Sequence, residues 1–386
     1  MNPLKISFLT ILVHFVFLSG AQDKTDNRMQ WKIAAELPAS NGQSKATGVA
    51  GPVAGVYDHL LIVAGGANFP DAMPWLGGKK KYYDNVYVFV KNAAGVKLQS
   101  KTGKLPHAIA YSASCSAKKG IVYAGGENKE GISKKAFLLQ WEAEKASVVA
   151  EGLPDLPVAL TNSSAVAIGD LVYIAGGETP EAVSADFFCL DLNNISPGWK
   201  KMPSLPKPVS HTVFVAQSNG DHPCLYLLGG RKKNNDGISD LYASAYCFDL
   251  EKNQWKEIKS LPYPLCAGTG IAEGSFHILL FGGDRGESLH KSEILFSAFK
   301  RETDPVKKKE LNKERAMIQS SHPGFSKEVL FYNTVRDDWE TFDSLPYDAP
   351  ATTTAVSWGK DIILPSGEIR AGVRSPYLLA GELKQH

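Results

Sequence analysis

Glu368 and Arg374 lie six residues apart in the stretch SGEIRAGVRS, residues 366–375, close to the end of the chain. A carboxylate can accept a proton, and a guanidinium can bind another carboxylate through two parallel hydrogen bonds. A neighbouring positive charge keeps the first carboxylate ionised, so the two side chains together could remove a proton from a bound acid. Gly367 and Gly372 give the backbone of this short segment the freedom to turn. We therefore take Glu368 and Arg374 as the candidate catalytic residues.

The same stretch is an altered copy of a pattern that occurs five times earlier in the chain. In each earlier copy a β-rich apolar run ends in Gly-Gly, whereas the last copy ends in Ser-Gly. The runs are LLIVAGG at 60–66, GIVYAGG at 120–126, LVYIAGG at 171–177, LYLLGG at 225–230, HILLFGG at 277–283 and IILPSG at 362–367. The second glycine recurs after 60, 51, 53, 53 and 84 residues. A Leu-Pro pair precedes each run, and a Trp precedes that pair in five of the six units, at positions 31, 141, 199, 255 and 339.

A repeat of about fifty residues with Gly-Gly, an aromatic strand and a Trp is typical of the kelch repeat, which forms one four-stranded blade of a propeller. Glycine lets the backbone leave an inner strand sharply, and the Trp fills space between adjacent blades. The pattern predicts an all-β fold, a six-bladed kelch β-propeller that takes up residues 22–386 as one domain. The strand expected at 29–37 carries Trp31 but has no unit of its own. We expect it to pair with the C-terminal blade and close the ring, which leaves no open sheet edge.

In a propeller, the segments that follow the doublets all return at one rim around a central funnel. Two of these segments are unusually long. The first contains Trp75 and the run Lys79-Lys80-Lys81, and the fifth extends over about 285–327 and includes KKKELNKERAMIQ, a good helix-forming composition. Long loops in compact folds are often lids or binding elements, so we expect a helical lid insertion in the fifth blade. For the individual lysines, a solvated helix face is the simpler interpretation.

A charged residue directly after the doublet is common in this chain, as Glu127, Glu178, Arg231 and Asp284 occupy the same position as Glu368. A charge there is therefore not by itself a sign of catalysis. We take four residues that follow their doublets closely as candidates for lining the funnel and binding substrate: Asn68, Glu127, Arg231 and Arg285. A structural role remains open for each of the four.

The composition is that of an ordinary globular protein, with 44% hydrophobic and 21% charged residues in a chain of 386. Residues 1–21 combine Lys5, an apolar run from Ile6 to Leu18 and the small residues Ser-Gly-Ala, which predicts a cleaved secretory signal rather than a membrane anchor. Without it the chain has 41 basic and 40 acidic residues, a net charge of +1. This balance gives no electrostatic basis for binding nucleic acid or a membrane surface. Export without a lipid-anchor cysteine favours the periplasm.

The five cysteines form no CxxC pair and no cluster with histidines at zinc-binding spacing. We expect them to be buried thiols, although a disulfide stays possible. No motif for a metal, a nucleotide or a redox cofactor appears, so we expect no cofactor. A copper-radical oxidase on the same fold would need a grouping of Tyr, His and Cys ligands that the nine histidines do not provide.

The chain resembles the bacterial kelch-type N-acetylneuraminate epimerases, the sialic acid mutarotases. That family has a loop Asn-Gly-Glu-Ala-Lys-Pro-Gly-Leu-Arg-Thr, which aligns with SGEIRAGVRS, and the segment VAGPVAGVYDHLLIVAGGANF also matches. The blade order resembles that of a cyclically permuted branch. The resemblance implies that Glu368 accepts the proton of the anomeric hydroxyl and that Arg374 is the active-site arginine. Ile369-Arg370-Ala371 replaces Ala-Lys-Pro, which keeps one basic residue and loses the proline.

The resemblance implies an isomerase that acts on a small acidic sugar. Proton removal at the anomeric hydroxyl and protonation of the ring oxygen would open the ring, and closure on the other face would interconvert the α and β anomers. General acid–base assistance of this kind contributes about 10²–10⁴-fold. The alternative is a non-catalytic secreted propeller that binds a glycan or a protein through the same rim.

Overall fold

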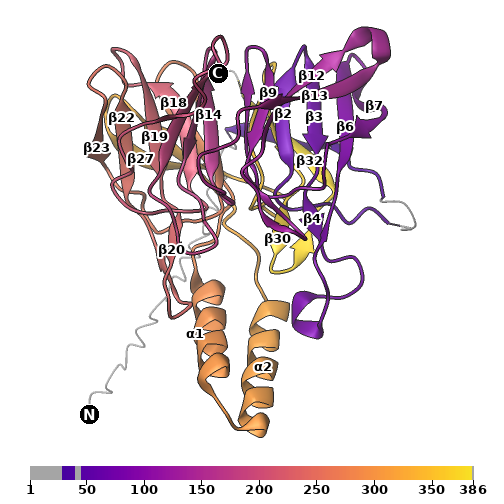
Figure 1. The fold of residues 1–386 in the computed structure, drawn as a ribbon, viewed down its shortest axis with the longest axis vertical. Coiled ribbons are helices and arrows are strands. Elements are labelled where there is room, and N and C mark those ends of the chain that lie inside the picture. Colours follow the sequence, from indigo (N-terminus) through magenta and orange to yellow (C-terminus); the bar gives the residue numbers. More distant parts are fainter. Residues whose placement is uncertain (1–27, 40–44, 385–386) are drawn as a thin grey trace, which may run out of the picture.

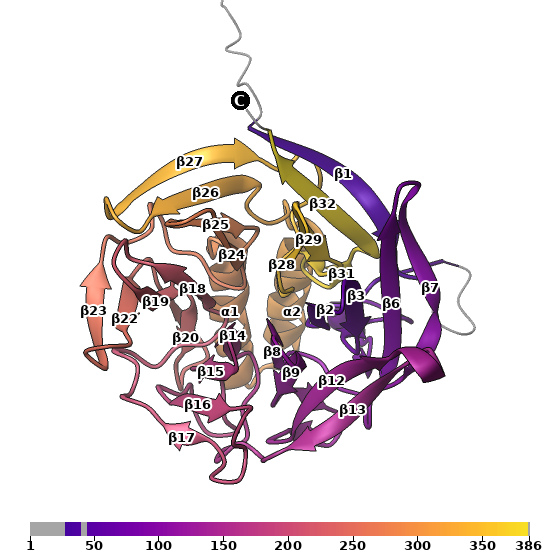
Figure 2. The same cartoon turned by 90° about the horizontal axis from the view of Figure 1, so that it is seen from above.

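The structure is a computed structural model that describes residues 28–39 and 45–384. Six four-stranded antiparallel sheets surround a central axis, and the innermost strand of each sheet runs beside it (Figure 2). The first blade consists of β2 (Val53–Tyr57), β3 (Leu60–Ala64), β6 (Asn85–Asn92) and β7 (Gly95–Lys104). The second consists of β8 (Ala113–Ala117), β9 (Gly120–Ala124), β12 (Ala136–Glu142) and β13 (Ser147–Leu153). The third consists of β14 (Ser164–Ile168), β15 (Leu171–Ala175), β16 (Phe187–Asp191) and β17 (Lys200–Lys201).

The fourth and fifth blades are β18 (Val213–Ser218), β19 (Pro223–Leu228), β22 (Ala245–Asp249) and β23 (Gln254–Ile258); and β24 (Thr269–Glu273), β25 (His277–Phe281), β26 (Glu328–Asn333) and β27 (Asp338–Ser344). The sixth consists of β28 (Val356–Trp358), β29 (Asp361–Pro365), β32 (Tyr377–Leu383) and β1 (Met29–Glu36). The predicted six-bladed propeller is therefore confirmed. The export signal predicted for residues 1–21 lies outside the described residues.

The sixth blade joins the two ends of the chain. Its outer strand β1 pairs with β32 from Met29 opposite Leu383 to Glu36 opposite Tyr377. The indole of Trp31 covers Gly381, where an added Cβ would lie only 2.7 Å from the ring, so this position requires glycine. The expected closure by the N-terminal strand is confirmed.

The hydrophobic core is divided among the gaps between blades. Each of six buried clusters combines side chains from two neighbouring sheets; the cluster between the fifth and sixth blades, for example, includes Phe281, Val329 and Leu364. Three of the repeated tryptophans also link blades, because each indole N–H donates to a carbonyl next to the preceding blade: Trp199 to Pro154 at 2.8 Å, Trp255 to Pro203 at 3.1 Å and Trp339 to Lys259 at 2.8 Å. The five cysteines are free, and four of them are buried.

The glycine doublets bring adjacent blades into close contact. Both residues of every doublet have positive φ, and a Cβ on the first glycine would lie 2.1–2.6 Å from a carbonyl oxygen of the next blade. In the sixth blade Ser366 stands at this position with φ 58°. Its hydroxyl donates to the carbonyl of Val49 at 2.9 Å and accepts from the N–H of the same residue at 2.9 Å. The altered doublet thus keeps the contact between blades through a side chain.

The segments after the doublets return at one rim, as predicted. Four of them form small hairpins: β4 (Ala67–Asn68) with β5 (Lys81–Tyr82), β10 (Glu127–Asn128) with β11 (Gly131–Ile132), β20 (Arg231–Lys233) with β21 (Ser239–Leu241), and β30 (Glu368–Arg370) with β31 (Val373–Arg374). The first long loop adds the 3₁₀ turn η1 (Pro74–Leu76), and a second such turn, η2 (Ala143–Lys145), connects β12 and β13. Figure 1 places β4, β20 and β30 on the face of the propeller that also carries the helices.

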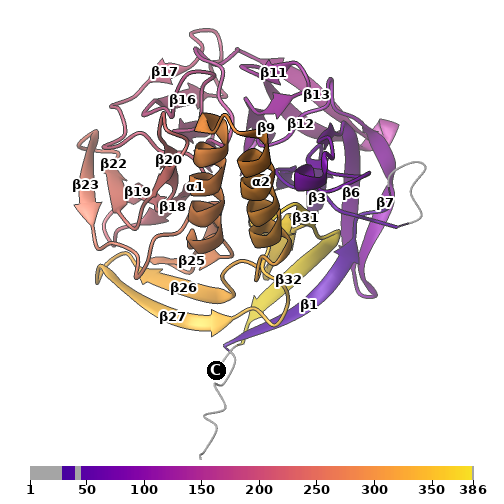
Figure 3. The ribbon, with the colours of Figure 1, turned by 90° about the horizontal axis from the view of Figure 1, so that it is seen from below.

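The insertion in the fifth blade is a helical hairpin of α1 (Glu287–Arg301) and α2 (Pro305–Ser320). The predicted helical composition corresponds to α2, which begins at Pro305 after the N-cap Asp304, whose carboxylate accepts from two backbone N–H groups. Viewed from below, the hairpin lies in front of the centre of the ring (Figure 3). In the described part of the chain, neither helix is long and apolar enough to cross a bilayer.

Candidate active site

A closed belt of six backbone hydrogen bonds surrounds the axis. In five blades the residue two positions before the innermost strand, and in the sixth the residue four positions before it, donates its N–H to the carbonyl of its counterpart in the preceding blade, at 2.7–3.0 Å. The belt residues are Gly51, Tyr111, Asn162, His211, Ala267 and Thr352. All six have φ between 50° and 60°, a conformation that costs a non-glycine residue about 1–3 kcal/mol, and the belt is what holds them there.

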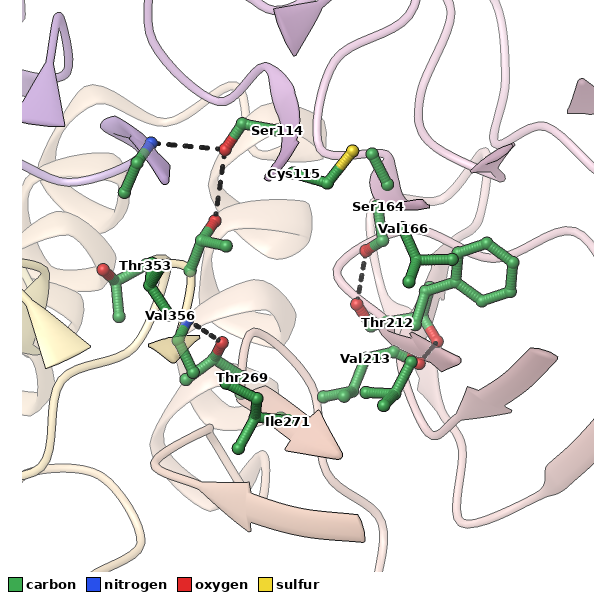
Figure 4. Close-up of a pocket in the computed structure, with 18 of the residues that line it drawn as sticks. Ser114, Cys115, Ser164, Val166, Thr212, Val213, Thr269, Ile271, Thr353 and Val356 are labelled. Atoms are coloured by element: carbon green, nitrogen blue, oxygen red, sulfur yellow. Dashed lines mark hydrogen bonds between the residues drawn. The ribbon is translucent and has the colours of Figure 1, made fainter. Parts of the chain in front are cut away.

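The belt lies between two cavities on the axis, because five of its six residues line both of them. The first, of about 510 Å³, continues among the innermost strands and is shown in Figure 4. We call it the axial cavity. The second, of about 440 Å³, opens toward the hairpins and the helical insertion, and we call it the rim cavity.

Glu368 and Arg374 both line the rim cavity. They are opposite each other in the hairpin of β30 and β31, which places their side chains on the same face. Arg374 Nη1 lies 3.4 Å from Glu368 Oε1. The same carboxylate oxygen accepts the backbone N–H of Gly372 at 2.7 Å, which fixes the carboxylate within the hairpin.

The guanidinium of Arg374 is buried with hydrogen-bonding capacity unused. Its side chain is 4% exposed, and the ring of Phe69 lies beneath it with the centroid 4.8 Å from Cζ. Within residues 28–39 and 45–384, Arg374 Nε and Nη1 have no hydrogen-bond partner. A buried charged donor without a partner is costly, so these two N–H groups are suited to an anionic ligand that enters the cavity.

The first long loop contributes a second ionic contact to the cavity. Lys80 Nζ donates to Glu127 Oε1 at 2.9 Å, and the hydroxyl of Tyr82 donates to the same oxygen at 2.8 Å. Burial alone would lower the pKa of Lys80, but the Tyr111 phenol and the Glu127 carboxylate outweigh it and raise that pKa above its usual value. Burial and the bond to Glu127 raise the pKa of Tyr82 to about 12. Both groups therefore keep their protons at neutral pH.

A third ionic group lies on the third and fourth blades. Glu178 Oε1 is 3.5 Å from His211 Nδ1 and 3.8 Å from Arg231 Nη2. Burial would raise the pKa of Glu178, but the hydrogen bond from His211 and the charge of Arg231 lower it to about 2. Burial first, and then Arg231, lower the pKa of His211, so the imidazole is neutral at pH 7. Arg231 Nη1 also lies 3.5 Å from Glu293 on α1, which brings the helical insertion into contact with the propeller.

Comparison with known proteins identifies the family of the chain. A sequence profile described as N-acetylneuraminate epimerase matches residues 20–148 and 153–386. The chain belongs to the N-acetylneuraminate epimerase family.

Curated relatives carry the same description at modest identity. The N-acetylneuraminate epimerase of Brucella melitensis biotype 1 is 26% identical over 234 residues, which cover 60% of this chain and 59% of the relative. That of Haemophilus influenzae strain PittEE is 26% identical over 235 residues, 59% of each chain, and that of Vibrio vulnificus strain YJ016 is 26% identical over 58% and 57%. The chain thus spans about three-fifths of the length of these curated relatives.

In this member of the N-acetylneuraminate epimerase family, the position after the doublet determines which predicted residues reach the cavity. Side chains one position after the doublet line it, and these are Glu127, Glu178, Arg231, Asp284 and Glu368. Each of them forms a backbone bridge to the segment before the innermost strand of its own blade. Since side chains alternate in extended backbone, the next residue points elsewhere.

Asn68 and Arg285 occupy that second position, and the structure does not bring them to the rim cavity. Asn68 is 2% exposed and bonds the carbonyl of Gly48 at 2.8 Å, with the Tyr83 hydroxyl donating to its Oδ1 at 2.8 Å. Arg285 is held by Glu328 at 2.8 Å and stacks on Tyr263 at 3.7 Å from the ring centroid. Both side chains stabilise the rim itself.

Several lining residues were absent from the sequence-based candidates. They are Lys80, Glu178, His211, Asp284 and a group on the helical insertion. The alternation described above would have found Glu178 and Asp284. His211 is a belt residue, but it stands 19 residues before the second glycine of its doublet, whereas four of the other belt residues stand 15 residues before theirs, so the spacing of the repeat did not point to it. Among the described residues no group of three or more His, Cys, Asp or Glu is placed to hold a metal ion.

Proposed function

We propose that this protein is a sialic acid mutarotase, which accelerates the interconversion of the α and β anomers of N-acetylneuraminate in the rim cavity. Glu368 accepts the proton of the anomeric hydroxyl while the ring oxygen takes up a proton from solvent water, and the ring opens to the keto form. Closure on the other face of the carbonyl reverses both proton transfers and inverts the anomeric centre. Atoms and charge balance over the cycle, since each proton taken is returned.

The observation that carries this proposal is the buried Arg374 beside an ionisable carboxylate. Its buried Nε and Nη1 form no hydrogen bond within the described residues, so the guanidinium keeps donors for a substrate carboxylate. In a 2-keto acid sugar the anomeric hydroxyl is on the carbon next to the carboxylate. A substrate whose carboxylate binds Arg374 therefore has its anomeric hydroxyl close to Glu368, since Arg374 Nη1 and Glu368 Oε1 are 3.4 Å apart. Proton transfer by a positioned group is worth about 10²–10⁴-fold, which suits a reaction that also proceeds unaided.

NMR spectroscopy of freshly released α-N-acetylneuraminate tests the proposal. We expect the wild-type protein, at a small fraction of the sugar concentration, to shorten the time to equilibrium without changing the final anomer ratio. Glucose, which lacks the carboxylate, is the matched control and should equilibrate at its spontaneous rate. Equal rates for N-acetylneuraminate with and without protein would refute mutarotase action.

The same measurement separates an enzyme from a non-catalytic glycan-binding propeller. A binding protein shifts the anomer ratio in proportion to its own concentration and does not turn over. A change in the final ratio at stoichiometric protein, with no acceleration at lower amounts, would favour that second function.

A further inference from the structure

The rim cavity has two chemically different walls. The propeller wall carries the charged side chains, whereas the helical insertion contributes only uncharged residues on α1, α2 and the turn after α2: Ser288, Leu289, Ser292, Ile318, Gln319, His322 and Phe325. The wall from the insertion therefore suits a part of the ligand that is neutral and partly apolar. A substrate with a carboxylate at one end and such a group at the other would use both walls.

Gln319 offers a hydrogen-bond acceptor in this neutral wall. It lies on the last turn of α2, and its Oε1 is buried without a hydrogen-bond partner in the described part of the chain. Leaving a buried carbonyl oxygen unpaired costs about 1–3 kcal/mol. Because the Gln319 side chain lines the cavity, a rotation of the amide would turn this oxygen toward a donor on the ligand, for example an amide N–H.

His322 offers a donor beside it. Its Nδ1 accepts the backbone N–H of Gly324 at 3.1 Å, so the ring N–H that can donate is on Nε2. The side chain is 8% exposed. A Cβ on Gly324 would lie 3.5 Å from the carbonyl oxygen of Ile369, which places this turn against the hairpin that carries Glu368.

Apolar side chains complete the wall. Leu289 and Ile318 come from the two helices, and the ring of Phe325 lies 5.0 Å from that of His322 between centroids. An acceptor, a donor and an apolar surface match the three parts of an N-acyl group, which has one N–H, one carbonyl oxygen and an alkyl end. A hydroxyl group could use the polar atoms, but it would leave the apolar surface without a partner.

We propose that this wall of the helical insertion binds the N-acyl group of the substrate, with Gln319 accepting the amide N–H and His322 donating to the acyl carbonyl. The inference rests on the proposed function, because it assumes that the substrate carboxylate binds at Arg374. It assigns to the insertion a role in selecting N-acylated acidic sugars over those with a hydroxyl group at the same carbon.

The test compares Gln319→Leu with the wild type on two sugars, N-acetylneuraminate and the analogue in which a hydroxyl replaces the acylamino group. We expect Gln319→Leu to lower kcat/KM for N-acetylneuraminate about tenfold or more, and to change the value for the hydroxyl analogue less than twofold. Met317→Ala is the matched control, because this α2 residue is 54% exposed and should leave both values unchanged. The melting temperature of each variant shows that it is folded, and Gln319→Ala replaces Gln319→Leu if the larger side chain prevents folding.

The outcomes distinguish this inference from the proposed function. If the wild type accelerates neither sugar, the proposed function fails. If the wild type accelerates both sugars and the Gln319 variant lowers both rates equally, or neither, only the N-acyl site is overturned. If the wild type accelerates N-acetylneuraminate alone, the variant decides: a loss of about tenfold in Gln319→Leu supports the N-acyl site, and an unchanged rate overturns it.

Discussion

The two cavities on the propeller axis are both lined by residues of the backbone belt, but they differ in the chemistry of their other side chains. The axial cavity is the larger, at about 510 Å³ against about 440 Å³, yet among the described residues no carboxylate, lysine or arginine lines it. Its wall consists of aliphatic side chains and of hydroxyl groups such as those of Ser114, Thr269 and Thr353 (Figure 4).

These hydroxyl groups already have partners. Thr269 Oγ1 accepts the N–H of Ala355 at 2.7 Å, and Thr353 donates to the carbonyl of Pro365 at 2.7 Å. Among the described residues, one side chain of the axial cavity, Ser163, has a buried oxygen without a partner, whereas in the rim cavity Arg231, Arg374 and Gln319 all keep such atoms. Size therefore does not identify the site. Unused hydrogen-bonding capacity on buried charged groups does, since burying it is costly unless a ligand takes it up.

Glu368→Gln should produce the largest effect, a fall in kcat of about 10²–10⁴-fold. Glutamine keeps an oxygen that can accept the N–H of Gly372, so the hairpin and substrate binding should persist while the proton acceptor is lost. NMR exchange rates at saturating sugar measure kcat, and calorimetry measures binding. An unchanged kcat would mean that Glu368 is not the proton acceptor, and the rim cavity would then lack the catalytic group that distinguishes it from the axial cavity.

Arg374→Met should come next, with kcat/KM lower by about 30- to 1000-fold, because removing a buried charged partner costs about 2–4 kcal/mol. Arg374→Lys keeps the charge but loses the planar fork, so its loss should be smaller. The methyl ester of the substrate is the internal control. Wild type should bind the ester poorly, and Arg374→Met should treat ester and acid alike; a persistent preference for the acid would place the carboxylate elsewhere.

The sequence predicted those features that depend on the repeat. The doublets locate the end of the second strand in every blade, because their close contact with the next blade requires positive φ. The strand at 29–37 had no unit of its own, so the open edge of the last blade was the place predicted for it. The proximity of Glu368 and Arg374 was also predictable, since both lie in one short hairpin.

What the sequence did not predict depends on contacts between segments that have no fixed spacing. The composition of α2 indicated a helix, but nothing in it showed that Gln319 faces the cavity while Met317 faces solvent. Lys80 is the middle residue of a run of three lysines, and nothing in that run showed that Lys80 is the one that pairs with Glu127 from the next blade. Arg231 and Arg285 differ by one position after their doublets, a difference that reverses the direction of the side chain.

The pH dependence of stability should distinguish the two cavities by a smaller effect. The pKa of Glu178 is about 2, against about 4.3 in an unfolded chain, so its contribution is fully present above about pH 4.3 and is lost as the pH falls toward 2. Over that range we expect the free energy of unfolding to fall by about 2–3 kcal/mol less in Glu178→Gln than in the wild type. Urea unfolding at successive pH values measures the difference. The pKa of His211 is also lowered, which gives a slope of the same sign, and because Glu178 counteracts that lowering the substitution changes this slope as well; the difference between the two proteins therefore reports the pair of Glu178 and His211. If the free energy of unfolding depends on pH in the same way in both proteins, Glu178 is not stabilised by His211 and Arg231 as described here.

Thr269→Val should have the smallest effect, and it tests the axial cavity directly. Valine has nearly the shape of threonine, so the substitution removes one hydroxyl and leaves the N–H of Ala355 buried without its acceptor, at a cost of about 1–3 kcal/mol in unfolding free energy. Because Thr269 belongs to the fifth blade and Ala355 precedes the innermost strand of the sixth, the lost bond weakens one join of the ring and touches no charged group of the rim cavity. We expect kcat and KM for N-acetylneuraminate to stay within twofold of wild type while the urea midpoint falls. A folded variant that loses as much kcat as Glu368→Gln would show that the axial cavity takes part in the chemistry. Hydroxyl groups that already have hydrogen-bond partners would then not indicate an inactive cavity.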